Sequence, residues 1–148
     1  MNRLGHIGLA LLVLSPLIGK FDLNFVLIAV ALTIAPDIDL VLRIEHRKYT
    51  HNITFASIVA ILVFMLTKSS WLTFLVLLSI FAHLVADLLT VQKFAPLYPF
   101  SKKKYALKLF KSNNTAVNTA VLLLGIASFA YFSNLDFSEL LTDLTKLI

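Results

Sequence analysis

The sequence is divided into five apolar segments separated by polar connections. They are residues 4–19, 23–42, 53–67, 71–91 and 115–132. A membrane-spanning helix needs roughly 17–25 residues, so three segments are long enough and the first and third fall slightly short. We therefore predict an all-α integral membrane helical bundle with about five transmembrane helices, formed as a single domain over residues 1–148.

The composition also favours a membrane protein. Hydrophobic residues make up 59% of the chain and charged residues only 14%, whereas a soluble domain carries roughly 45–50% and 25%. A chain this apolar can bury enough surface to avoid disorder. The absence of cysteine excludes disulfides, thiolate metal sites and cysteine nucleophiles.

The two ends of the sequence carry further signals. Arg3 before the first apolar segment suits a signal peptide, but no small-residue cleavage site follows, so we expect a helix that is retained. From Asp136 onward, apolar residues recur at helical spacing, and Asp136 with Glu139 has the form of a capping box. We expect a short C-terminal amphipathic helix that lies in the outer interface of the membrane.

Basic residues are distributed unequally between the two sides of the predicted bundle. Five spans place the termini on opposite sides, and ten of the 13 Lys and Arg residues fall on the N-terminal side. Because positive charge marks the cytoplasmic side, we predict that the N-terminus and the second and fourth connections lie in the cytoplasm. The longest connection, residues 92–114, holds Lys102, Lys103 and Lys104, and we expect it to contact anionic membrane lipids.

Ionisable side chains within or beside the apolar segments form a second pattern. Such residues are costly in a bilayer and indicate functional sites. The predicted topology brings seven of them into one layer, at or just below the cytoplasmic surface: His6, Asp37, Asp39, His46, His51, His83 and Asp87. The sequence places no comparable set at the opposite face. We predict that these seven residues form one site.

The types and spacing of these residues suit metal binding. His83 and Asp87 are four residues apart and share one face of a helix. Asp37 and Asp39 would diverge on a regular helix, but Pro36 favours a local break that lets both carboxylates converge. Imidazole combined with carboxylate suits zinc, manganese or iron, and seven candidate ligands suit two ions. Taken singly, each residue also has a structural explanation, as a packing residue, a helix-end group or an ion-pair partner.

The order of these residues is similar to that of a known family. The motifs are His6, Pro36-Asp37-Ile38-Asp39, His46-Arg47-x-x-Thr50-His51, His83-x-x-x-Asp87-x-x-Thr90 and Pro96-x-x-Pro99-Phe100. In combination they resemble the YdjM-like family, whose members are described as membrane-bound metal-dependent hydrolases. The resemblance implies a small multi-span helical inner membrane protein with a metal-hydrolase site. A looser similarity to zinc-dependent phospholipases C suggests phosphoester chemistry. Departures from the family pattern at residues 48–49 and 52 remove no candidate ligand.

These observations together predict a membrane-embedded metal-dependent hydrolase in which the metal activates water. Asp39 is the predicted bridging carboxylate, and Asp39 or His46 would orient the nucleophile. Arg43 and Arg47 are the predicted phosphate-binding residues, although simple anchoring at the cytoplasmic face explains both equally well. The depth of the site favours a lipid or another amphiphilic substrate. A phosphoester bond is favoured, and an ester or amide bond stays open.

Two classes without catalysis compete with this hypothesis. A proton or metal-ion transport protein needs polar residues that continue to the opposite face, and here they stop at one side. A structural metal site that only joins helices has a closed coordination shell with no position open to water. We expect no nucleic-acid partner, because no aromatic or fold pattern accompanies the basic cluster at residues 102–111.

Overall fold

The regular elements of the molecule are helical throughout the part that the structure describes. This structure is a computed structural model that describes residues 1–134, so the amphipathic helix predicted from Asp136 lies outside the described residues. The helices are α1 (Arg3–Leu14), α2 (Leu23–Leu32), α3 (Ile38–Leu42), α4 (Ile53–Thr67), α5 (Ser70–Leu88) and α6 (Thr115–Ser133). Within residues 1–134, β-structure is limited to three isolated bridges. The predicted all-α class is confirmed.

The five predicted apolar segments are all helical. A 3₁₀ turn joins α2 to α3, so that Leu23–Leu42 runs as one broken helical segment. Three segments are long and apolar enough to cross a membrane: Leu23–Leu42, Ser70–Leu88 and Thr115–Ser133. The other two apolar helices, Arg3–Leu17 and Ile53–Thr67, are shorter, as the lengths of the first and third apolar segments predict.

Side-chain caps explain where the helices begin. The side chain of Asn52 accepts a hydrogen bond from the main-chain N–H of Phe55 at 2.9 Å and thereby caps the start of α4. Helix α5 ends at Leu88, three residues before the predicted end of its segment. The reason is that the main chain of Val91 donates to the carbonyl of Phe110 at 3.1 Å, which joins it to the long connection.

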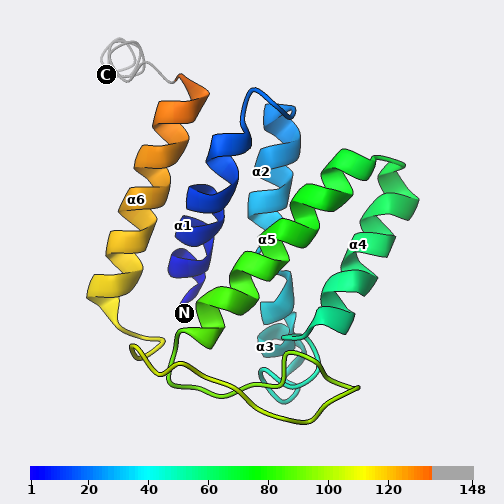
Figure 1. Cartoon of the computed structure of the whole chain (residues 1–148), viewed down its shortest axis with the longest axis vertical. Coiled ribbons are helices and arrows are strands. Elements are labelled where there is room, and N and C mark those ends of the chain that lie inside the picture. Colours follow the sequence, from blue (N-terminus) through cyan, green and yellow to red (C-terminus); the bar gives the residue numbers. More distant parts are fainter. Residues whose placement is uncertain (135–148) are drawn as a thin grey trace.

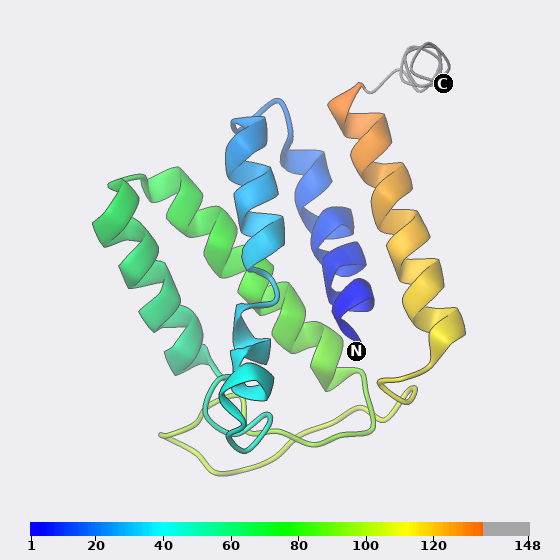
Figure 2. The same ribbon diagram turned by 180° about the vertical axis from the view of Figure 1, so that it is seen from behind.

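Helix α5 lies at the centre of the bundle. It packs against α1, α2 and α4, while α6 packs mainly along α1; Figures 1 and 2 show this arrangement from opposite sides. The apolar core lies among α1, α2 and α5, with one contribution from α4. It is made of Ala10, Leu14, Val26, Ala29, Val30, Ala56, Leu72, Leu75, Val76 and Ile80.

Two glycines allow α1 and α6 to approach closely. A Cβ atom built on Gly8 would lie 2.5 Å from the Cα of Leu122, and one built on Gly125 would overlap the carbonyl oxygen of Gly8. Because lipid and core side chains are equally apolar, helices in a membrane associate by such close backbone packing. The contact between Gly8 and Gly125 therefore fixes the position of α6.

Replacing Gly125 by leucine is expected to destabilise the protein by about 1–3 kcal/mol, the range for overpacking a well-packed interface. The added side chain meets the backbone of α1, which cannot yield as a flexible side chain would. The measurement is thermal unfolding in detergent. Ala127→Leu is the matched control, because Ala127 lies on the exposed face of the same helix. Equal melting temperatures for the two variants would contradict this account.

The two long polar connections lie at one end of the bundle. Residues 43–52 link α3 to α4, and residues 89–114 link α5 to α6. In Figure 1 both connections cover the lower end, where α1 and α6 begin and α5 ends. This end gathers residues that are far apart in the sequence.

Candidate metal centre

The break at Pro36 sets the positions of two carboxylates. Ala35–Asp37 forms a 3₁₀ turn with Pro36 inside its first turn, and α3 begins at the next residue. The two aspartates converge on opposite nitrogens of one imidazole: Asp37 Oδ1 lies 3.4 Å from His51 Nε2, and Asp39 Oδ2 lies 3.3 Å from His51 Nδ1. The predicted break is present, and it brings together carboxylates that a regular helix would separate.

Four side chains from two helical segments and a connection form a closed ring of ligand atoms. His51 Nε2 lies 3.4 Å from Asp37 Oδ1 and 3.3 Å from Asp87 Oδ2. On the other side, His83 Nε2 lies 3.9 Å from Asp37 Oδ1 and 3.7 Å from Asp87 Oδ2. Each carboxylate oxygen therefore lies between two imidazole nitrogens. We call Asp37, His51, His83 and Asp87 the ligand ring.

The distances around the ligand ring fit shared coordination better than hydrogen bonding. An N–H···O hydrogen bond spans about 2.7–3.2 Å, and all four separations are longer. Ligands about 2.0–2.2 Å from one tetrahedral ion lie roughly 3.3–3.6 Å from one another. The two separations at His51 fall in this range, and the two at His83, 3.7 and 3.9 Å, slightly exceed it. Three ring atoms are also buried without a hydrogen-bond partner: His51 Nε2, His83 Nε2 and Asp87 Oδ2. Unpartnered buried polar atoms are costly, so the donor set fits a divalent metal ion.

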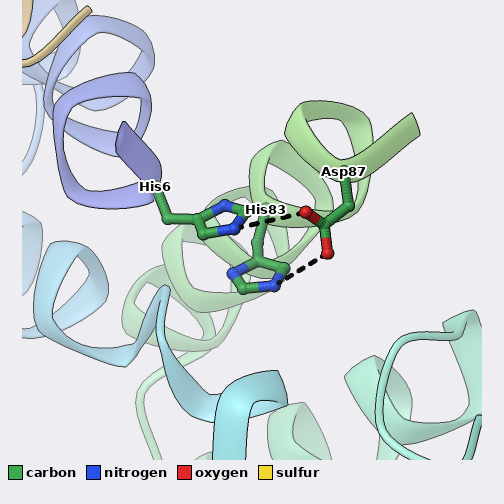
Figure 3. A group of neighbouring side chains, drawn as sticks. All are labelled: His6, His83 and Asp87. Atoms are coloured by element: carbon green, nitrogen blue, oxygen red, sulfur yellow. Dashed lines mark ion pairs between the residues drawn. The ribbon is translucent and has the colours of Figure 1, made fainter. Parts of the chain in front are cut away.

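His6 extends the ring towards α1. Its imidazole stacks on that of His83, with ring centroids 3.6 Å apart and planes 9° from parallel. His6 Nε2 lies 3.4 Å from Asp87 Oδ1, and Figure 3 shows His6 and His83 facing different oxygens of the same carboxylate. His6, His83 and Asp87 thus form a second group of closely spaced candidate ligands.

Asp39 lies behind His51 and is held by several hydrogen bonds. Its Oδ2 accepts from the main-chain N–H of Arg47 at 3.0 Å and from the hydroxyl of Thr50 at 2.8 Å. Its Oδ1 lies 2.9 Å from His46 Nδ1. A carboxylate behind a ligating histidine fixes the orientation and tautomer of its ring. Asp39 acts on His51 through Thr50, whose hydroxyl oxygen lies 3.1 Å from His51 Nδ1. It also belongs to a third group of candidate ligands with His46 and His51.

Arg47 enters the interior, whereas Arg43 does not. The guanidinium donates from Nη2 to Asp87 Oδ1 at 2.6 Å and from Nη1 to Thr90 Oγ1 at 3.1 Å. The main-chain nitrogen of Met1 also donates to Asp87 Oδ1, at 2.5 Å. Arg43 is exposed and ends α3 in the left-handed conformation, with φ 54°. Phosphate binding by either arginine stays a prediction.

One histidine of the cluster faces outward. The side chains of His6, His51 and His83 are at most 1% exposed, whereas that of His46 is 34% exposed. Beside His46, the Lys48 ammonium bonded to the Glu45 carboxylate holds the pKa of Glu45 below its ordinary value, and Lys104 acts in the same direction. Polar access to the cluster therefore lies on the side of the connections.

The structure brings all seven predicted ligands together at one end of the bundle. They fall into the three groups described above, which share His51 or His83. Sequence reasoning assigned no role to Thr50 and Thr90, which hydrogen-bond to Asp39 and Arg47. Both follow histidine or aspartate at fixed spacing in the motifs, and that position was the only available signal.

The fold and the cluster define a helical membrane protein with a buried histidine–aspartate centre. The sequence matches the family described as YdjM inner membrane protein over residues 1–142. The chain therefore belongs to the YdjM inner membrane protein family. Comparison with curated proteins and with solved structures gave no significant match.

Proposed function

We propose that this chain is a membrane-embedded metal-dependent hydrolase that acts on a phosphoester bond of a lipid or another amphiphilic substrate. The observation that carries the proposal is the ligand ring. Its imidazole nitrogens and carboxylate oxygens converge at separations of 3.3–3.9 Å, and three of the four atoms lack a hydrogen-bond partner. Two imidazoles and two carboxylates suit zinc, with manganese and iron as alternatives.

Each residue around the ring has a distinct part in this proposal. Asp37, His51, His83 and Asp87 would hold the ion, which when bound supplies Lewis-acid activation of water and of the scissile ester. Asp39 and Thr50 keep His51 oriented towards the ring. His46 is the proposed general base or acid, because it contacts Asp39 and is the histidine that solvent reaches.

The number of bound ions depends on how many of the three groups of candidate ligands hold a metal ion. The ligand ring accounts for one ion, and the groups built on His6 and on His46 provide candidate ligands for the second ion predicted from the sequence. Asp39 as the bridging carboxylate stays part of that two-ion hypothesis. Metal stoichiometry decides between one ion and two.

The distribution of buried charge favours a hydrolase over a transport protein. Among residues 1–134, the buried ionisable side chains are His6, Asp37, Asp39, Arg47, His51, His83 and Asp87. They all belong to the cluster. Beyond it, the buried polar side chains around α1, α2 and α5 are the uncharged hydroxyls of Ser15, Thr33 and Ser79. A transported ion would have no ionisable groups to follow through the core of these helices. The excess of basic residues on the same side supports a cytoplasmic site.

Elemental analysis of the detergent-purified protein tests the proposal. Protein prepared without chelator is expected to contain one or two equivalents of zinc, manganese or iron. Chelation is expected to lower the melting temperature, and adding the metal back is expected to restore it, because an ion that binds only the folded state stabilises that state. Turnover of lipid phosphoesters is then measured with and without metal.

The outcomes separate the competing functions. Protein that contains no metal and takes none up would contradict the hydrolase proposal. Stoichiometric metal without turnover of phosphoesters, esters or amides would favour a metal that only stabilises the helices. Metal-dependent ion flux in proteoliposomes would favour transport.

A further inference from the structure

A basic cavity adjoins the outward-facing side of the cluster. It has a volume of about 470 Å³ and lies between the connections at residues 43–52 and 89–114. Five basic side chains and one acidic side chain, Glu45, line it. The basic residues are Arg47, Lys48, Lys93, Lys102 and Lys104. Two chain segments about fifty residues apart in the sequence thus contribute positive charge to one hollow.

Within residues 1–134, three of these five basic side chains have no carboxylate partner. Arg47 is neutralised by Asp87 at 2.6 Å, and Lys48 by Glu45 at 2.5 Å. For Lys93, Lys102 and Lys104, no carboxylate of residues 1–134 lies within 4.0 Å of the ammonium nitrogen. Three like charges around one hollow repel one another, and an anion inside it would replace that repulsion by attraction.

The basic cavity and the candidate metal centre have one side chain in common, that of His46. His46 lines the cavity, and its Nδ1 lies 2.9 Å from Asp39 Oδ1, which in turn orients His51. Tyr49 and Tyr98 form another part of the wall, with ring centroids 5.8 Å apart at 82°. The ammonium groups of lysine and the phenol groups of tyrosine both donate hydrogen bonds. Neither group carries a negative charge that would repel a bound anion. Such a lining suits phosphate oxygens.

We propose that this basic cavity binds the phosphate-bearing head group of the substrate, with Lys93, Lys102 and Lys104 as its phosphate-binding residues. The assignment rests on the proposed function and names the substrate class for that site: a molecule whose head group carries a multiply charged phosphate. His46 lies between the cavity and the ligand ring, so a head group bound in the cavity would lie next to the candidate metal centre.

Calorimetric binding to the full-length protein in neutral detergent, after treatment with chelator, tests this subsite. The probes are dihexanoyl phosphatidic acid and inorganic phosphate, at fixed ionic strength because surface charge is screened by salt. The double variant Lys102→Gln/Lys104→Gln removes two cavity charges. The matched control, Lys103→Gln/Lys111→Gln, removes two charges from the same connection at residues that do not line the cavity.

We expect the cavity variant to bind phosphatidic acid at least about tenfold more weakly, the factor for loss of one charge-assisted hydrogen bond. The control is expected to bind within about twofold of the parent protein, since a separated surface charge contributes little. Similar affinity for inorganic phosphate would support the subsite and assign it to soluble phosphates. Preference for the lipid would support it and assign it to lipid head groups.

Equal weakening in both double variants would overturn the proposal, because general attraction between the basic connection and anionic lipid predicts that result. Absence of saturable binding would also overturn it. The metal-free condition separates this proposal from the hydrolase proposal. Protein that binds metal but shows no cavity-specific binding loses only the subsite, and cavity-specific binding without any metal uptake leaves only the subsite.

Discussion

Replacing His51 by alanine is expected to lower the metal affinity of the protein by more than about 100-fold. His51 is fully buried, its Nε2 belongs to the ligand ring, and its Nδ1 faces Asp39. Removing an outer partner of a ligand already costs roughly 10–100-fold in affinity, and this substitution removes the ligand itself. The measurement is metal content by elemental analysis, followed by titration with a competing chelator.

The matched control is His46→Ala. His46 contacts Asp39, but it does not belong to the ligand ring, and its side chain is 34% exposed. We expect this variant to keep the ion of the ligand ring and to lose turnover, because the proposed proton-transfer group is missing. Equal loss of the first equivalent of metal in both variants would contradict the ring assignment. Monodisperse elution of His51→Ala and His51→Gln shows that the fold is kept.

Replacing Arg47 by methionine is expected to destabilise the protein by about 3–5 kcal/mol, the range for breaking a buried ion pair by removing one partner. The guanidinium donates to Asp87 at 2.6 Å, to Thr90 at 3.1 Å and to the carbonyl of Gln92 at 3.3 Å. Methionine fills a similar volume without donating to any of these acceptors. The measurement is thermal unfolding in detergent under metal-free conditions.

Arg43→Gly is the control for loss of positive charge on the same connection. Arg43 is exposed and adopts φ 54°, a left-handed conformation that glycine adopts without strain. We expect its stability to stay within about 0.5 kcal/mol of the parent protein. A stable Arg47→Met protein with weakened phosphate binding would instead assign Arg47 to the substrate, as the sequence-based hypothesis has it.

The positions of the helices follow from the sequence because hydrophobicity is a local property. Each predicted apolar segment is helical, and the break at Pro36 lies where the missing N–H donor predicts it. The end of α5 was placed three residues too late. Nothing local distinguishes Thr90 and Val91 from helix, and it is the pairing of Val91 with Phe110 that turns the chain away.

The membership of the site also follows from the sequence, for a different reason. Ionisable residues are rare in membrane helices because they are costly there, and those that occur are usually functional. His6, His83 and Asp87 can therefore be recognised in their apolar segments. Once five alternating spans are assumed, residues at corresponding ends of the helices share one layer. The direct contacts among the predicted ligands agree with that layer.

The helical class, the segments and the set of ligand candidates can therefore be predicted from the sequence, since these depend on composition and on spacing along one helix. The division of these candidates into ligands and supporting residues depends on the packing of distant segments. This packing places Asp37 in the ligand ring and Asp39 behind His51, turns Arg47 inward to Asp87, and folds the long connection so that its lysines line a cavity. These outcomes depend on distances between residues that are 12 to more than 40 positions apart in the sequence. Close packing of the helices and connections sets these distances, and no local pattern encodes them.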